Sequence, residues 1–283
     1  MDTVLVTGAG GYIGRHVVRT LHGMGVSVVS LDFGSEPIEG ASRHISADIL
    51  SSGFRIEDHF DEIPDACLHL AWRNGFNHND PSHMQDLSGH FSFVQSLIDA
   101  GAGRVAVMGS MHEVGYWEGP IDQDTPCNPQ SLYGVAKDAL RRSIFLRAEG
   151  TATSVQWLRG FYIYGDDEGS QSIFGKLLRA AKSGETTFPF TSGRNKYDFL
   201  SIDELAFQIA MCVMQGEVTG VINCCSGRPV SLADQVEEFI AAKGLDISLK
   251  YGAYPDRPYD SPGVWGDDSK IRLILGSNDG ARS

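Results

Sequence analysis

Short hydrophobic runs alternate with longer segments of helical spacing through the first part of the chain. The hydrophobic runs predict strands at residues 4–6, 26–31, 44–46, 66–70, 104–108 and 154–158. Between them, the spacing of hydrophobic residues predicts helices at 12–24, 84–100 and 132–148. Strands that alternate with helices form right-handed βαβ units. We therefore expect an α/β fold built on a doubly wound parallel sheet.

The rhythm of the chain changes after Gly165, where stretches rich in Gly, Pro, Asp and Asn separate the predicted elements at 166–172, 189–198 and 252–263. Here we expect helices at 173–182, 203–215 and 232–242 and short strands at 221–222 and 248–251. This pattern is typical of a loop-rich lobe placed over a sheet. Two domains are predicted: residues 1–165, with return segments near 198–225, and a smaller C-terminal lobe formed mainly by 166–283.

The charge of the chain narrows the classes of partner. Lys and Arg number 23 and Asp and Glu number 36 among the 283 residues, so the net charge at pH 7 is −13. Such a chain repels a nucleic-acid backbone, and its longest basic run is Arg141-Arg142. No hydrophobic stretch approaches the ~20 residues of a membrane span, and the N-terminus has no signal-peptide pattern. We expect neither a nucleic-acid partner nor a membrane segment.

The five cysteines stand at positions 67, 127, 212, 224 and 225 and form no C-x-x-C pair. An odd number without that motif predicts neither a disulfide framework nor a zinc site. We interpret them as reduced, mostly buried thiols of a cytoplasmic protein, and we expect no metal site.

A glycine-rich turn joins the first predicted strand to the first helix, with the sequence Thr7-Gly8-Ala9-Gly10-Gly11-Tyr12-Ile13-Gly14. Glycines at 8, 11 and 14 form G-x-x-G-x-x-G, a variant of the dinucleotide-binding fingerprint. They let the backbone approach a pyrophosphate, which then meets the free N–H groups of the helix N-terminus. Asp32 ends the second strand, where a carboxylate binds ribose hydroxyls and repels a 2′-phosphate. The sequence therefore predicts a Rossmann domain over 1–165 that binds NAD(H) rather than NADP(H).

Tyr133 and Lys137 form a Y-x-x-x-K pair near the start of the helix predicted at 132–148. The i, i+4 spacing places both side chains on one face, and a nearby ammonium lowers the pKa of a phenol from about 10. The pair can pass a proton to or from a substrate hydroxyl while a hydride moves to or from the cofactor. Ser110 follows the fifth strand and either hydrogen-bonds the reacting oxygen or caps the next turn.

With these motifs the chain resembles the extended short-chain dehydrogenase/reductases, the nucleotide-sugar epimerase/dehydratase family, over nearly its whole length. Further carriers of the resemblance are Asp48-Ile49, Leu70-Ala71-Trp72, Pro129 and the segments 158–165, 198–206 and 257–260. The resemblance implies that the cofactor contacts Gly8, Gly11, Tyr12, Ile13, Gly14, Asp32, Asp48, Ile49, Leu70, Ala71, Trp72, Tyr133, Lys137, Phe161 and Ile163. It also implies a nucleotide-diphosphate sugar as substrate and a homodimer formed through the helices at 84–100 and 132–148.

Several positions that the resemblance assigns to the substrate depart from the family pattern. Tyr162 stands where an Asn is usual, Tyr197 where an Arg is usual, and Asp86 where an Asn is frequent. Arg194 either supplies the missing charge or lies solvated in a loop, and His112 either contacts the substrate or bonds to backbone. Expected substrate contacts are therefore His112, Glu113, Tyr162, Arg194 and Arg257, the last of these gripping the diphosphate.

The residues after Ser110 bear on the reaction. Dehydratases of the family carry an acidic pair there, whereas this chain has Met111-His112-Glu113, with one acidic residue. Segments 69–72 and 109–117 resemble reductases that act on dTDP-4-dehydro-6-deoxyglucose in bacterial surface-polysaccharide pathways. We predict NAD(H)-dependent reduction of a 4-keto-6-deoxy nucleotide sugar. The alternatives are a 4-epimerase, a disfavoured 4,6-dehydratase and, in another class, a non-catalytic NAD(H) sensor, which typically lacks the Tyr–Lys pair.

Overall fold

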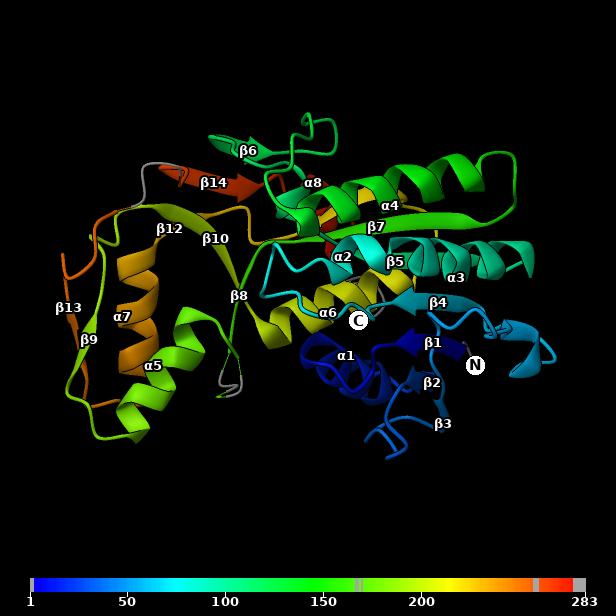
Figure 1. Ribbon diagram of the computed structural model, residues 1–283, viewed down its shortest axis with the longest axis horizontal. Coiled ribbons are helices and arrows are strands. Elements are labelled where there is room, and N and C mark those ends of the chain that lie inside the picture. Colours follow the sequence, from blue (N-terminus) through cyan, green and yellow to red (C-terminus); the bar gives the residue numbers. More distant parts are fainter. Residues whose placement is uncertain (1–2, 166–167, 169, 257–259, 277–283) are drawn as a thin grey trace.

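Seven parallel strands form the main sheet of the computed structural model, which describes residues 3–165, 168, 170–256 and 260–276. They run in the order β11-β7-β5-β4-β1-β2-β3 (Figure 1). Their bounds are Thr3–Thr7 (β1), Ser27–Asp32 (β2), Arg43–Ser46 (β3), Ala66–His69 (β4), Arg104–Ser110 (β5), Ser154–Gly160 (β7) and Gly220–Cys224 (β11). The strand order reverses between β1 and β4, where ligands of such sheets bind. The predicted doubly wound parallel sheet is confirmed.

Helices cover both faces of this sheet. One face carries α1 (Tyr12–Gly23), α6 (Ile202–Val213) and α8 (Ser269–Gly276), and the other carries α2 (Ser82–Gln85), α3 (Leu87–Asp99) and α4 (Leu132–Ala148). Successive residues of β1 serve opposite faces: Val4 and Val6 belong to the first core and Leu5 to the second. All three are fully buried, as a strand covered on both sides requires.

A smaller part of the molecule lies beside the carboxyl ends of the main-sheet strands (Figure 1). Its sheet has the order β12-β10-β14-β6, and β8 pairs with β10. The bounds are Gly119–Ile121 (β6), Tyr162–Tyr164 (β8), Lys196–Ser201 (β10), Pro229–Ser231 (β12) and Gly263–Gly266 (β14). Helices α5 (Ile173–Lys182) and α7 (Leu232–Lys243) and the parallel pair β9 (Thr187–Pro189) and β13 (Ser248–Lys250) complete it.

The chain passes between the two parts several times. It leaves the main sheet through β8, builds α5 and β9, and returns through β10 into α6 and β11. A second excursion forms β12, α7, β13 and β14 before α8 packs again on the main sheet. Loops from both parts therefore meet at the carboxyl edge. The domain boundary at residue 165 stays a prediction.

The structure agrees with most of the predicted elements and differs in three respects. The helix predicted at 84–100 is two helices that meet at Asp86, whose carboxylate accepts a hydrogen bond of 2.7 Å from Arg73 Nη2. Segment 189–198, predicted as a loop, contains the start of β10. Strands β6, β8, β9, β12 and β14 were not predicted, because three- and four-residue strands show no clear alternation. Helix α8 was not predicted either. None of the described helices is long and apolar enough to cross a bilayer.

Candidate active site

The turn between β1 and α1 requires glycine at two positions. Gly8 has φ +65°, and a Cβ there would lie 2.6 Å from the backbone N of Ala71. A Cβ on Gly14 would lie 2.1 Å from the carbonyl oxygen of Gly8. Gly11 is the N-cap of α1 and has no side chain to cap the N–H groups of the first turn, which begins at Tyr12 and includes Ile13. The backbone is therefore shaped to bring a pyrophosphate to these N–H groups.

Asp32 lies beside this turn at the end of β2. Its carboxylate accepts the N–H of Gly10 at 2.7 Å and the N–H of Phe33 at 2.7 Å. Asp48 follows β3 with an exposed side chain, whereas Ile49 beside it is buried. The structure thus places the predicted ribose-binding carboxylate directly against the glycine turn.

Other predicted cofactor residues flank the turn on both sides. The N–H of Leu70 donates to the carbonyl of Thr7 at 3.2 Å, and that of Ala71 to the Thr7 hydroxyl at 3.3 Å. Phe161 and Ile163 lie where β7 leads into β8, in or against the core that also contains α1. Beside them, a Cβ on Gly165 would lie 2.6 Å from the hydroxyl of Tyr12, so the end of β8 adjoins the turn.

Tyr133 and Lys137 lie in the first two turns of α4, which begins after the N-cap Ser131. The Ser131 hydroxyl accepts the N–H of Gly134 at 3.2 Å, which fixes the start of the helix. A Cβ on Gly134 would lie 2.3 Å from the carbonyl oxygen of His112, so glycine lets α4 pack directly on the turn after β5. The Ser110 side chain lies near enough to the Tyr133 hydroxyl to act on its pKa. The three predicted catalytic residues are therefore neighbours.

The ionisation of these groups follows from their burial. Burial raises the pKa of Tyr133 to about 12, although the nearby Ser110 side chain acts in the opposite direction. Burial lowers the pKa of Lys137 to about 7, against the attraction of Glu113. Before any ligand contributes, Tyr133 is thus a protonated phenol near neutral pH.

Trp72 fixes the ammonium of Lys137 from one side. The Lys137 Nζ lies 3.7 Å from the centre of the Trp72 ring and donates to the carbonyl of Met108 at 2.8 Å. Trp72 stacks on His90, with 4.3 Å between ring centres, and its Nε1–H donates to Nδ1 of His83 at 3.0 Å. Indole nitrogen only donates, so the His83 proton is on Nε2, which donates to the Asn77 carbonyl at 2.9 Å.

Histidines that sequence reasoning did not single out surround the Tyr133 ring. His78 lies parallel to it, with 5.3 Å between centres and 13° between planes, and His83 meets it edge-on at 5.2 Å. The predicted His112 is also near, at 6.0 Å from Tyr133 and 4.2 Å from His78. Burial lowers the pKa of His112 to about 4, with a further contribution from His78. The clustered histidines at 69, 78, 83 and 90 in and after β4 were the only available signal.

Glu113 is not placed as a substrate contact, and this expectation is corrected. Its side chain is 0% exposed, and Oε1 accepts the N–H of Ser110 at 2.6 Å and the Nε1–H of Trp157 at 2.8 Å. Oε2 lies 3.5 Å from Arg141 Nε and 3.6 Å from Arg159 Nη2. Ser110 and Glu113 form a capping box around the short 3₁₀ helix η2 (Met111–Glu113). Glu113 therefore holds the backbone of Ser110 from within the core. The spacing Ser-x-x-Glu, which is typical of a capping box, was the sequence signal for this role.

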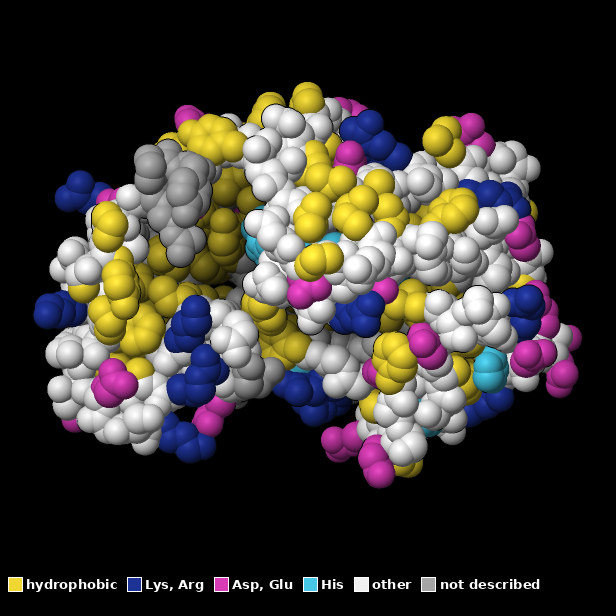
Figure 2. Space-filling model, viewed as in Figure 1, with side chains coloured by type: hydrophobic (Ala, Val, Ile, Leu, Met, Phe, Trp, Pro, Cys, Tyr) yellow, Lys and Arg dark blue, Asp and Glu magenta, His cyan; other side chains and the backbone are white. Residues whose placement is uncertain are grey.

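The other expected substrate residues lie in the smaller part. Tyr162 packs on Tyr197, with 4.3 Å between ring centres, so two aromatic rings occupy the positions where the family pattern has polar residues. Arg194 is exposed in the loop before β10, and its charge contributes to lowering the pKa of Asp256. Arg257 lies outside the described residues. Figure 2 shows the surface hollowed between the two parts, with hydrophobic side chains in the hollow.

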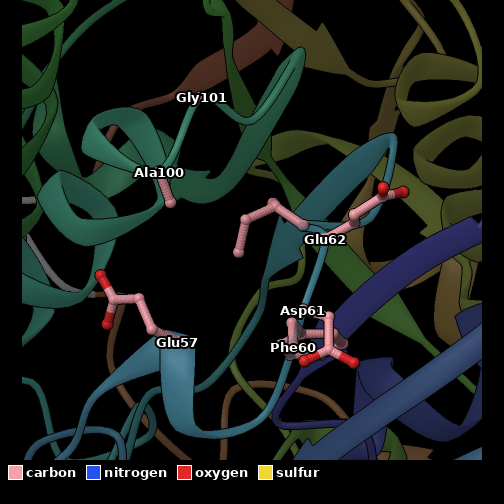
Figure 3. Close-up of a pocket in the computed structure, with 7 residues that line it drawn as sticks. Glu57, Phe60, Asp61, Glu62, Ala100 and Gly101 are labelled. Atoms are coloured by element: carbon pink, nitrogen blue, oxygen red, sulfur yellow. The ribbon is translucent and has the colours of Figure 1, made fainter.

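A separate pocket opens away from these residues. It has a volume of about 440 Å³ and lies between the 3₁₀ helix η1 (Ile56–Asp58) with the loop after it and the end of α3 (Figure 3). Its lining residues are Glu57, Phe60, Asp61, Glu62, Ile63, Ala100 and Gly101. Three carboxylates make it unsuited to a diphosphate, and it contains no residue of the predicted site.

Known proteins resemble the chain over most of its length. The profile of the NAD dependent epimerase/dehydratase family matches residues 4–225. A dTDP-6-deoxy-L-talose 4-dehydrogenase (NAD(+)) of Aggregatibacter actinomycetemcomitans is 43% identical over 268 residues, covering 93% of this chain and 98% of that protein. A UDP-glucose 4-epimerase of Lactobacillus helveticus is 25% identical, covering 96% and 91%. The solved structure of MoeE5 in complex with UDP-glucuronic acid and NAD has a TM-score of 0.77 at 27% identity, covering 98% and 93%.

Proposed function

Because the chain belongs to the NAD dependent epimerase/dehydratase family, we propose that it reduces the C4 ketone of a 6-deoxy nucleotide sugar with NADH. The observation that carries this proposal is the placement of Tyr133 beside Ser110, where α4 packs on the turn after β5 through Gly134. The Tyr133 phenol stays protonated there because partial burial raises its pKa to about 12. A protonated donor beside a hydroxyl is what the protonation of a ketone requires.

The predicted family, the enzyme class and the cofactor NAD are confirmed. The described residues fit this cofactor, because the close approach at Gly8 and Gly14 leaves room only for bare backbone beside the N-terminus of α1. Asp32 would bind the adenosine ribose and would repel a 2′-phosphate. Asp32→Ala should therefore narrow the preference for NADH over NADPH, and a wild-type enzyme that works better with NADPH would overturn this role.

The chain's own residues supply proton transfer and orientation. We infer that the ketone oxygen lies between the hydroxyls of Ser110 and Tyr133, where Ser110 donates a hydrogen bond and Tyr133 donates the proton. Lys137 lies one turn farther along α4, and its positive charge favours the phenolate that remains. NADH, when bound, supplies the hydride to C4. In the reverse direction the same phenolate accepts the proton of the C4 hydroxyl.

The identity of the substrate is inferred from a relative and from charge. The relative at 43% identity is named for dehydrogenation at C4 of a 6-deoxy sugar carried by dTDP, which is the reverse of a C4 ketone reduction. The chain has a net charge of −13, so a diphosphate needs local cations. We propose Arg194 and Arg257 for the diphosphate, and His112 and Tyr162 for the walls of the sugar pocket.

A 4-epimerase remains the second candidate, because the same Ser–Tyr–Lys group serves it and a UDP-glucose 4-epimerase is among the relatives. A 4,6-dehydratase is less well supported, since Glu113 is buried under Ser110 and bonded there. A non-catalytic NAD(H) sensor would have no need for the assembled group. A homodimer and a cytoplasmic location stay predictions, and light scattering tests the first.

The proposal is tested with a panel of dTDP-, UDP-, GDP- and CDP-linked 4-keto-6-deoxy sugars and NADH. Absorbance of NADH follows turnover, and nuclear magnetic resonance gives the configuration at C4 of the product. Net oxidation of NADH supports the reductase. Exchange of C4 epimers without net oxidation identifies the epimerase instead, and tight NADH binding without turnover of any sugar identifies the sensor.

A further inference from the structure

The loop between β4 and α2 is attached to the turn of α4 that carries Tyr133. The N–H of Tyr133 donates to the carbonyl of His78 at 2.9 Å, and the N–H of Leu132 donates to Oδ1 of Asn79 at 3.3 Å. The first N–H groups of a helix have no partner within the helix, so the loop supplies the missing acceptors. The backbone of His78 and that of Tyr133 are therefore held together.

This attachment sets the ring of His78 against the ring of Tyr133. The two planes differ by 13° at 5.3 Å between centres, and His112 meets the other ring edge of His78 at 4.2 Å. His78 and Tyr133 are both partly buried, so each ring shields part of the other from solvent. The His78 imidazole thus packs on the Tyr133 ring and contacts the ring of His112 in η2.

The loop has internal bonds that keep this arrangement. His83 Nε2 donates to the carbonyl of Asn77 at 2.9 Å, and the Nδ2 group of Asn74 donates to the hydroxyl of Ser82 at 3.0 Å. Asn74 has φ +58°, a backbone conformation that Asn adopts more readily than most residues. His78 therefore lies in a loop that is held by internal hydrogen bonds.

We propose that His78 is a positioning residue, which holds the Tyr133 phenol against Ser110 and keeps water from its ring. It acts through Tyr133 and has no contact with the reacting atoms. The inference rests on the proposed function, because it assumes that Tyr133 donates the proton to the ketone. A catalytic group displaced by about 1 Å can lose roughly 100-fold in rate, so the effect should fall on kcat.

Two substitutions separate positioning from simple structural support. His78→Ala should lower kcat about 10- to 100-fold and leave KM for NADH and the melting temperature nearly unchanged. His78→Phe keeps a flat ring in the stack and should restore most of the lost kcat. The control is His59→Ala, because His59 stacks on Phe54 at 5.3 Å and 23° outside the site. Wild-type kcat in His78→Ala, or a loss equal to that of the control, would overturn the proposal.

A measurement without turnover distinguishes this proposal from the proposed function. The Cζ resonance of ¹³C-labelled tyrosine reports phenol ionisation, and the Tyr133→Phe variant assigns the signal. Burial raises the pKa of Tyr133 to about 12, so the wild-type signal should not titrate up to about pH 10.5. In His78→Ala, water reaches the ring and titration should begin within that range. An unchanged titration removes the role of His78, whereas absence of any sugar reduction by the wild type removes only the proposed function.

Discussion

Glu113 beside the main sheet and Asp198 in β10 are both fully buried carboxylates, and they are surrounded by different kinds of groups. Glu113 accepts two N–H bonds on one oxygen and faces the guanidinium groups of Arg141 and Arg159 with the other. Burial raises the pKa of both acids, although the hydrogen bonds to each carboxylate, and the arginines beside Glu113, act in the opposite direction.

Asp198 is surrounded by backbone donors. It accepts the N–H and hydroxyl of Ser226 at 2.7 Å each, the N–H of Gly227 at 2.9 Å and the N–H of Gly266 at 3.1 Å. It therefore joins β10 to the loop after β11 and to β14. In the main-sheet part a charge network holds the backbone of Ser110, a predicted catalytic residue, whereas in the smaller part a carboxylate joins several loops. We expect substitutions in the first to change kcat and those in the second to change substrate KM.

The largest effect is expected from Tyr133→Phe, which removes the proton donor and keeps the ring stack. Loss of general acid catalysis typically costs about 10²–10⁴-fold in rate, so kcat should fall by that factor. Steady-state kinetics with NADH and the best sugar of the panel measures it, and fluorescence titration should give an unchanged NADH affinity. Retained turnover would remove Tyr133 from the mechanism.

The two carboxylates can be compared directly by neutral, isosteric substitution. Glu113→Gln removes the carboxylate that faces the fully buried Arg159, while Arg141 keeps its ion pair with Asp138, so the free energy of unfolding should fall by about 3–5 kcal/mol. Asp198→Asn leaves backbone donors with one oxygen fewer, and the loss should be about 1–3 kcal/mol. Urea unfolding of both variants at pH 7 measures the difference. Equal losses would show that charge plays no special part at Glu113.

Arg194→Ala tests whether the smaller part binds the diphosphate. A hydrogen bond to a charged group contributes about 1.5–3 kcal/mol, so KM for the nucleotide sugar should rise roughly tenfold or more while kcat stays near that of the wild type. Arg228→Ala, another exposed arginine of the smaller part, is the matched control. A rise of the same size in both variants would indicate a general charge effect instead of a specific site.

A further effect is a pH dependence of stability that comes from Lys137. Burial lowers its pKa to about 7 in the folded protein, below the ordinary value of 10.5, so the unfolded chain binds more protons between these values. The contribution of this group to stability is therefore present at high pH and is lost as the pH falls through about 7. Unfolding of Lys137→Met, relative to wild type, should show its greatest gain at pH 6 and a smaller one at pH 9. A pH-independent difference would contradict the lowered pKa.

Positions of candidate site residues could be predicted from the sequence where they depend on a single element. Tyr133 and Lys137 are one helical turn apart, and the glycine turn is a local backbone motif, so spacing alone places them. The position of His78 depends on a loop that folds back over α4. The contact joins residues that lie far apart in the chain, so local sequence patterns do not reveal it. Glu113 was assigned to the substrate because the sequence does not show which side of Ser110 it faces.

The smaller part was harder to predict for a physical reason. Its strands are three to six residues long and are held by loop hubs such as Asp198, so they carry little periodic pattern. Tyr162 and Tyr197 were noted only as departures, and their ring contact became evident once β8 and β10 were paired.

The Lys137 ammonium in front of the Trp72 indole also has an optical consequence. An indole emits at a wavelength that depends on the electric field across its ring, and the Lys137 ammonium, 3.7 Å from the ring centre, contributes to that field. Trp72 is therefore placed where its emission responds to the charge of Lys137, the predicted partner of Tyr133. Changes in the charge of Lys137 should alter the part of the emission that comes from Trp72, one of four tryptophans, and a fluorimeter can record this without any label.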